Sequence, residues 1–197
     1  MKKIIVVFSL VVVALTSCKV AKSIYNLKNC EYKYHSITGL TLAGVNLQNV
    51  TDLSSLNPLT ASGLIAAFSS ERTQLPLKFT LNLNVKNPTT SDALLDGLAY
   101  ILEIDDVEMA TGSVDSRLQI APGETSILPL SVNFDLRKVM SGQSANVIKN
   151  LAFNFVGLSD QPANVTIKLK PSLTIGGQVI DSPSYIPVSF VYGKNNK

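Results

Sequence analysis

The stretch LPLKFTLNLNVKNP, residues 75–88, alternates apolar and polar side chains with a period of two. Its apolar members lie at odd positions: Leu75, Leu77, Phe79, Leu81, Leu83 and Val85. Because successive side chains of a strand point to opposite faces, this pattern predicts a strand with one buried and one solvated face. Pro88 has no amide hydrogen to donate to a sheet, so the strand is expected to end at Asn87.

Other segments with strand character surround this one. The strands expected from them cover residues 31–50, 99–104, 107–113, 116–120, 125–134, 165–169 and 179–192. Turn residues separate several of them: Asp105 and Asp106, the APGE of residues 121–124, and the Gly-Gly pair of residues 176–177. Strands joined by such short turns pair antiparallel, which predicts a mainly β protein built as a sandwich or a barrel.

Two segments have the apolar spacing of a helix. Residues 59–72 (LTASGLIAAFSSER) predict a short helix, with three apolar residues on one face: Leu64, Ile65 and Phe68. Asp135 is a good N-cap for a second helical stretch, which Gly142 interrupts. The apolar residues of that stretch are Leu136, Val139, Met140, Val147, Ile148 and Leu151. We therefore expect one or two short helices beside the strands.

The N-terminus has the layout of a secretory signal peptide, because two lysines precede an apolar run over residues 4–15. This run is shorter than the ~20 residues that a membrane-spanning helix needs. The four residues at its end resemble a bacterial lipobox: Leu15, Thr16, Ser17 and Cys18. The alternatives are a plain signal peptide followed by a chance cysteine, and an uncleaved anchor.

The lipobox resemblance implies three parts of the chain. Residues 1–17 would be removed, Cys18 would carry covalent lipid, and residues 18–30 would be a tether before a single domain at residues 31–197. Each acyl chain contributes roughly 0.8 kcal/mol per buried methylene, so several would anchor the protein firmly. No other cofactor is expected. Lys19 replaces the aspartate typical of inner-membrane retention, and no acidic run resembles a surface-export tag, which favours the periplasmic face of the outer membrane.

Charge and cysteine content exclude several classes of protein. Without residues 1–17 the formal net charge falls from +3 to +1, and no basic run with interleaved aromatics indicates nucleic-acid binding. With Cys18 lipidated, Cys30 has no partner for a disulfide. About 180 residues suit one domain with a sizeable core.

The stretch from Phe79 to Phe134 resembles the group-2 late embryogenesis abundant family and its water-stress and hypersensitive-response domain. The matching residues are Asn87 and Pro88 at a strand end, Gly112 after a short strand, and Pro122 and Gly123 before the next. The likeness covers about residues 75–192. It implies a fibronectin- or immunoglobulin-like antiparallel sandwich with a helix and an association with desiccation stress, without a defined ligand or reaction.

This chain also departs from the family pattern. Thr89 stands where members often have Asn, and the segment 59–72 and the lipobox are additions. The combined features most resemble lipoproteins of Bacteroidota-type bacteria. Asn87 and Pro88 are then expected to form a structural turn, with a recognition loop as the functional alternative.

Residues suited to catalysis or metal binding are sparse. His35 is the single histidine, and Cys30 would lie on the opposite face of its strand, which argues against a nucleophile pair. One acidic cluster, residues 103–108 with Glu103, Asp105, Asp106 and Glu108, lacks the ligand alternation of a calcium loop. We expect no enzyme and no metal site, but an envelope lipoprotein with a protective or interaction role under desiccation or osmotic stress. A glycan- or protein-binding module of the envelope is the alternative.

Overall fold

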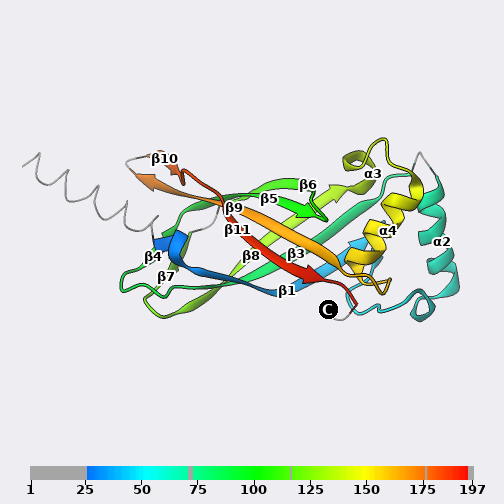
Figure 1. Cartoon of the computed structure of the whole chain (residues 1–197), viewed down its shortest axis with the longest axis horizontal. Helices are drawn as coiled ribbons and strands as arrows, with labels where there is room; N and C mark the ends of the chain where they lie inside the picture. Colours follow the sequence, from blue (N-terminus) through cyan, green and yellow to red (C-terminus); the bar gives the residue numbers. More distant parts are fainter. Residues whose placement is uncertain (1–25, 71–72, 116, 176, 195–197) are drawn as a thin grey trace, which may run out of the picture.

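The computed structural model describes residues 26–70, 73–115, 117–175 and 177–194. The molecule is elongated: strands form its body, helices gather at one end, and residues 26–30, just before the first strand, lie at the other end (Figure 1). The predicted class is confirmed, since the protein is mainly β, with antiparallel sheets and a few short helices.

The alternating stretch at residues 75–88 forms the centre of the first sheet. Its strand β3 (Pro76–Lys86) pairs antiparallel with β1 (Glu31–Leu42) on one side and β8 (Thr125–Asp135) on the other, while β2 (Val45–Asn46) extends the sheet beside β1. All six odd-numbered apolar residues of this stretch are buried. The alternation therefore identified the core-facing side of the sheet correctly.

The second sheet has the strand order β10-β9-β5-β6, and β11 also pairs with β9. Its strands are β5 (Gly97–Ile104), β6 (Val107–Val114), β9 (Ala163–Ile175), β10 (Gln178–Asp181) and β11 (Ile186–Tyr192). A separate two-stranded sheet joins β4 (Ala93–Leu95) to β7 (Leu118–Ile120).

Two strands after β3 differ from the prediction. The single last strand expected over residues 179–192 is two strands, because Ser182 turns inward and donates its amide to the Pro171 carbonyl at 2.7 Å. Strand β4 was not predicted at all. Three residues are too few to show a period of two.

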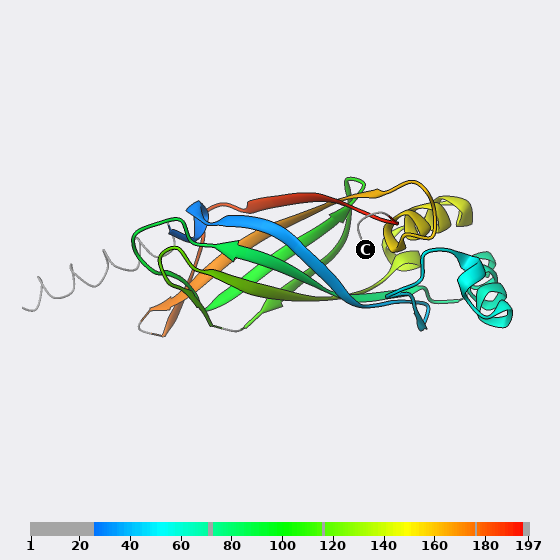
Figure 2. The same cartoon turned by 90° about the horizontal axis from the view of Figure 1, so that it is seen from below.

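One hydrophobic core joins the two larger sheets, whose strands run along the length of the molecule (Figure 2). Tyr34 of β1 stacks on Phe190 of β11 with ring centroids 4.6 Å apart, and Tyr100 of β5 donates its hydroxyl to the Ser131 carbonyl of β8 at 2.5 Å. Both contacts cross from one sheet to the other.

The helical segments are η1 (Leu53–Ser55), α2 (Pro58–Ser69), α3 (Leu136–Val139) and α4 (Ala145–Val156). Asp135 caps α3 as predicted, accepting the Arg137 amide at 3.0 Å. The predicted apolar faces are partly wrong: Leu64 and Phe68 are buried, but Ile65 and Val147 are exposed. Phe68 of α2 meets Phe153 of α4 edge to face, which holds the two helices together.

The signal peptide, residues 1–17, and the lipobox residues Leu15, Thr16, Ser17 and Cys18 lie outside the described residues. The described part of the expected tether, from Asn26, is packed on the domain: Asn26, Leu27 and Cys30 are buried. Asn26 Nδ2 donates to the Asp92 carbonyl at 3.0 Å, at the start of β4. Among the described residues, no helix combines the length and apolar character needed to cross a membrane.

Candidate functional site

The first candidate site is the loop where β3 ends. Asn87 is completely buried, and its side-chain Nδ2 donates to the carbonyls of Ser91 at 2.9 Å and Ile120 at 2.8 Å. Its Oδ1 accepts from the amide and the hydroxyl of Thr89 at 3.0 and 2.8 Å. An asparagine side chain has two donor hydrogens and one acceptor oxygen with two lone pairs, so all its hydrogen-bonding capacity is used within the protein.

The second family turn docks against the same asparagine. The Asn87 amide donates to the Glu124 carbonyl at 2.9 Å, and the Gly123 amide donates to the Asn87 carbonyl at 2.8 Å. Gly123 has φ of 78°, a left-handed conformation that glycine adopts without strain. The fold thus brings Asn87, Pro88, Pro122 and Gly123 together at one end of the molecule.

Gly112 lies apart from this cluster, on β6. A Cβ atom at this position would be 2.3 Å from the Tyr100 hydroxyl oxygen. The glycine therefore leaves room for the ring whose hydroxyl reaches Ser131 of the facing sheet. The geometry at Asn87 and at Gly112 supports structural roles for both.

The potentially reactive residues do not converge. His35 is exposed on β1, with Nδ1 3.4 Å from Asn84 Nδ2, whereas Cys30 is buried, and burial raises the pKa of its thiol to about 11. A thiol with so high a pKa is a poor nucleophile at neutral pH.

The acidic cluster is a hairpin end. Glu103 forms an ion pair with Lys168, and Asp105 Oδ1 accepts the Asn164 amide at 2.9 Å. Asp105 and Asp106 form the β5–β6 turn with φ of 48° and 63°. Across the described ranges, no group of three or more His, Cys, Asp or Glu residues is placed to hold a metal ion.

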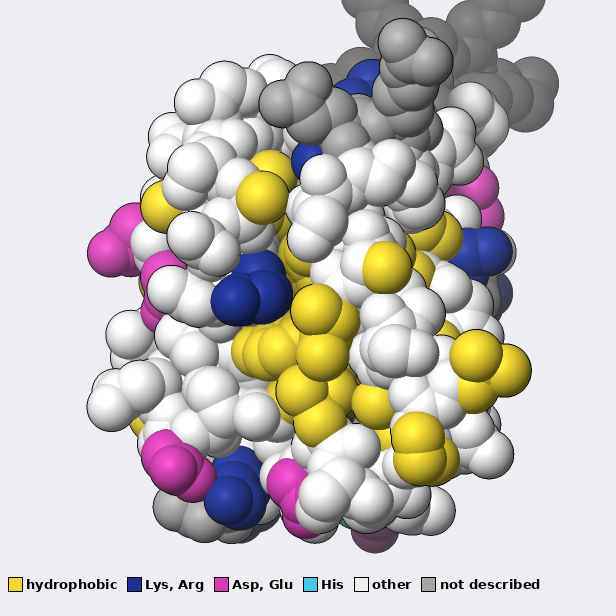
Figure 3. Space-filling view, turned by 90° about the vertical axis from the view of Figure 1, so that its right-hand side faces the viewer, with side chains coloured by type: hydrophobic (Ala, Val, Ile, Leu, Met, Phe, Trp, Pro, Cys, Tyr) yellow, Lys and Arg dark blue, Asp and Glu magenta, His cyan; other side chains and the backbone are white. Residues whose placement is uncertain are grey.

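A groove at the helical end was not foreseen. It has a volume of about 620 Å³ and lies between the β1–β2 turn and α2, against Ala43, Val45 and Leu64. Figure 3 faces this end and shows apolar side chains gathered across it. Leu59 of α2 is 82% exposed, and residues 53–70 contain no charged side chain. That absence of charge is the signal in the sequence that could have indicated an interaction surface.

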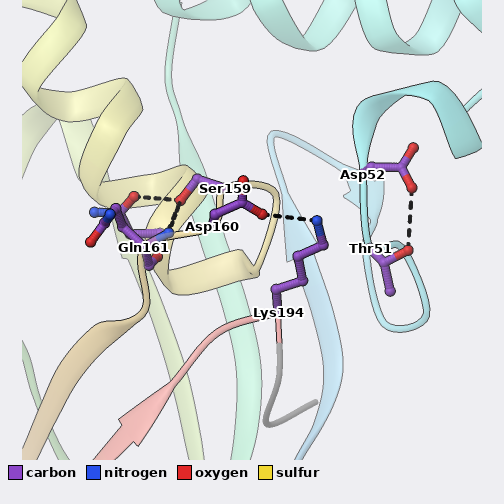
Figure 4. Close-up of polar contacts among 7 residues, drawn as sticks. Thr51, Asp52, Ser159, Asp160, Gln161 and Lys194 are labelled. Carbon is purple, nitrogen blue, oxygen red and sulfur yellow. Dashed lines mark hydrogen bonds and ion pairs between the residues drawn. The ribbon is translucent and has the colours of Figure 1, made fainter.

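Polar contacts border the same end of the molecule (Figure 4). Lys194 Nζ lies 2.9 Å from Asp160 Oδ1, and this carboxylate, with a smaller contribution from Asp52, raises the pKa of Lys194. Ser159 accepts the Gln161 amide at 3.2 Å within the same loop. These groups are largely exposed and hold the loops after α4 and before η1 near the C-terminal segment, without surrounding a cavity.

The antiparallel sheets and the turn at the buried Asn87, followed by the exposed Pro88, define a small β domain with helices at one end. The chain belongs to the late embryogenesis abundant protein family: the family model LEA_2, described as late embryogenesis abundant protein, matches residues 82–189. The matched segment contains all five family residues expected from the sequence, from Asn87 to Gly123. No curated protein matched the chain.

Solved structures with low sequence identity also resemble the chain. A crystal structure of a protein from Archaeoglobus fulgidus is 14% identical, with 81% of this chain and 97% of that chain covered and a TM-score of 0.37. A solution structure from Arabidopsis thaliana is 10% identical, with coverages of 62% and 71% and a TM-score of 0.40. A solution structure assigned to the late embryogenesis abundant proteins is 12% identical, with coverages of 92% and 88% and a TM-score of 0.38.

Proposed function

We propose that this protein is a lipid-anchored, non-enzymatic envelope lipoprotein of Bacteroidota-type bacteria that protects envelope components under desiccation or osmotic stress. The observation that carries the proposal is the LTSC sequence ending at Cys18 in a chain of the late embryogenesis abundant family. The lipid on Cys18 holds the domain at the membrane, on the periplasmic face of the outer membrane. The two sheets form the fibronectin- or immunoglobulin-like sandwich of that family.

Two structural observations are consistent with a non-enzymatic role. The buried Asn87 has no free hydrogen-bonding group for a substrate. The single histidine, His35, is exposed on β1 beside Asn84, whereas the acidic hairpin joins β5 and β6 of the other large sheet. General acid–base or nucleophilic chemistry requires such groups to converge.

The anchor is tested by growing cells with an alkyne analogue of palmitate and measuring label on the full-length protein. Wild-type protein should carry label and fractionate with the outer membrane, whereas the Cys18→Ser variant should lose both properties. Label that persists in Cys18→Ser would show attachment elsewhere and contradict the lipobox assignment.

The protective role is tested by drying and rehydrating a fragile reporter enzyme together with the Cys18→Ser protein. Recovery clearly above that given by an equal mass of albumin, and lost when the added protein is unfolded, is the expected result. Recovery equal to albumin would contradict direct shielding.

The second candidate, a binding module, is favoured by the apolar groove beside α2. This groove fits a protein segment better than a glycan, because sugar-binding surfaces present exposed aromatic rings. Among the described aromatic residues only Tyr185 is exposed, and it lies far in sequence from the groove. Photo-crosslinking from Ala66, exposed on α2, in intact cells should then recover one defined protein.

A further inference from the structure

The β9–β10 hairpin exposes apolar side chains on both faces of an edge strand. All four residues of β10 are exposed, with Val179 68% and Ile180 43% accessible. Residues 173–180 (LTIGGQVI) contain no charge. Edge strands are usually protected by charged residues, proline or a covering element. The one charge on β10 is Asp181 at the end of the strand, and Lys170 Nζ lies 3.6 Å from its Oδ2, which balances that charge. Residues 178–180 are therefore an exposed, uncharged edge, which indicates a contact surface.

This hairpin lies at the end of the molecule where the described chain begins. Asp96, which follows β4, donates its amide to the Ser172 carbonyl at 3.0 Å and accepts the Thr174 amide at 2.9 Å through Oδ2. Asn26 is hydrogen-bonded to Asp92, just before the same strand. Figure 1 shows β10 and residues 26–30 at the end opposite the helices, and the turned view of Figure 2 agrees.

The length of chain before Asn26 limits how far this end can be from the anchor. Seven residues, 19–25, separate Cys18 from Asn26. Even fully extended, this connection spans roughly 28 Å. A lipid on Cys18 would therefore keep the hairpin end beside the bilayer, while the helical end points away from it.

We propose that strand β10 rests in the interfacial layer of the membrane to which Cys18 is attached, with Val179 and Ile180 among the lipid headgroups. This inference rests on the proposed lipid anchor. Tyr185 supports it: this residue is 44% exposed, and Lys170 Nζ lies 5.8 Å from its ring centroid. Tyrosine and lysine are side chains that suit the boundary between lipid and water. The hairpin thus gives the tethered domain a second contact and a fixed orientation.

The test uses full-length protein purified from membranes and reconstituted into vesicles of phosphatidylethanolamine and phosphatidylglycerol. An environment-sensitive NBD probe is attached through maleimide to Val179→Cys, with Val147→Cys on α4 as the matched control at the opposite end. Val147 is also an exposed valine, so neither substitution disturbs the core. Cys30 stays unlabelled because it is buried and its raised pKa keeps it protonated. Mass spectrometry of the N-terminal peptide reports the lipid on Cys18 in the same sample.

The expected result is a shift of the emission at residue 179 to shorter wavelength and quenching by nitroxide-labelled lipid, with neither effect at residue 147. If Cys18 is lipidated and the probe at 179 behaves like that at 147, the hairpin contact is overturned and the anchor remains. If a shift at 179 needs no vesicles and grows with protein concentration, a second copy covers the edge and the inference is overturned. If Cys18 carries no lipid, the proposed function and this inference both fail.

Discussion

The side-chain amide of Asn87 donates to the backbone carbonyl of Ile120 across 2.8 Å and so joins the end of β3 to β7, 33 residues later in the chain. The hydrogen bond is buried, and a second one from the same nitrogen holds the Ser91 carbonyl. Strand β4 begins two residues after Ser91, so one side chain fixes both strands of the small sheet relative to β3.

Replacing Asn87 with aspartate should destabilise the domain by about 2–4 kcal/mol. The change removes two buried donors and places a carboxylate oxygen against two carbonyl oxygens, which either buries a charge or requires its protonation. Urea unfolding measures the effect, with Asn150→Asp, exposed on α4, as control. Equal midpoints for the two variants would show that the buried network contributes little.

Gly112→Ala should cost about 1–3 kcal/mol, because the new methyl group collides with the Tyr100 ring and displaces the hydroxyl that bonds Ser131. The cost should fall in a Tyr100→Leu background, where the colliding ring is absent. Thermal unfolding of the two single variants and the double variant measures this coupling. If the losses of stability in the two single variants simply add in the double variant, the cost of Gly112→Ala arises from the backbone of residue 112 and not from a collision with Tyr100.

Gly63→Ala should raise the free energy of unfolding, whereas the two substitutions above lower it. Gly63 lies within α2, and a Cβ atom added there has no neighbour within 4 Å. Alanine should therefore stabilise the helix by about 0.5–1 kcal/mol through its higher helix propensity. The expected measurement is a higher urea midpoint. A lower midpoint would contradict the open space around residue 63.

The sheet at the centre of the fold could be predicted because its information is local. Six buried residues lie at alternate positions over residues 75–85, the residues between them are polar from Lys78 onward, and Pro88 marks the end. The helices were also located correctly, through spacing and the Asp135 cap. Strand β4 carries no such local signal. It forms because residues 93–95 pair antiparallel with residues 118–120, which are distant in the sequence.

The surroundings of the site residues could not be predicted, because they depend on contacts distant in sequence. Asn87 and Gly123 were each recognised as turn residues, but nothing local indicated that one hydrogen-bonds the other. The exposure of Ile65 has the same cause: α4 covers one side of α2 only, and the spacing of α2 alone does not show which side. The packing of Leu27 was missed because a single apolar residue has no period.

Stability should fall in alkali through Cys30. Burial raises the pKa of the Cys30 thiol from its ordinary value of 9.0 to about 11, so the folded state binds this proton more tightly than the unfolded state does. The resulting stabilisation is fully present below pH 9.0 and is lost as the pH rises through about 11, by about 3 kcal/mol in total at about 1.36 kcal/mol per pKa unit.

In the Cys30→Ala variant the free energy of unfolding should fall less steeply with pH between about 9 and 11. Urea unfolding of wild type and variant at several pH values in this range measures that slope. A destabilisation by alanine that is the same at every pH shifts the curve but does not change its slope. Burial also raises the pKa of four tyrosines from the ordinary value of 10.0: Tyr32, Tyr34, Tyr100 and Tyr192. A loss of stability that begins near pH 10 should therefore remain in the variant, and the slope between pH 9 and 10 isolates the thiol. Identical slopes for the two proteins would show that the thiol is solvated in the folded state.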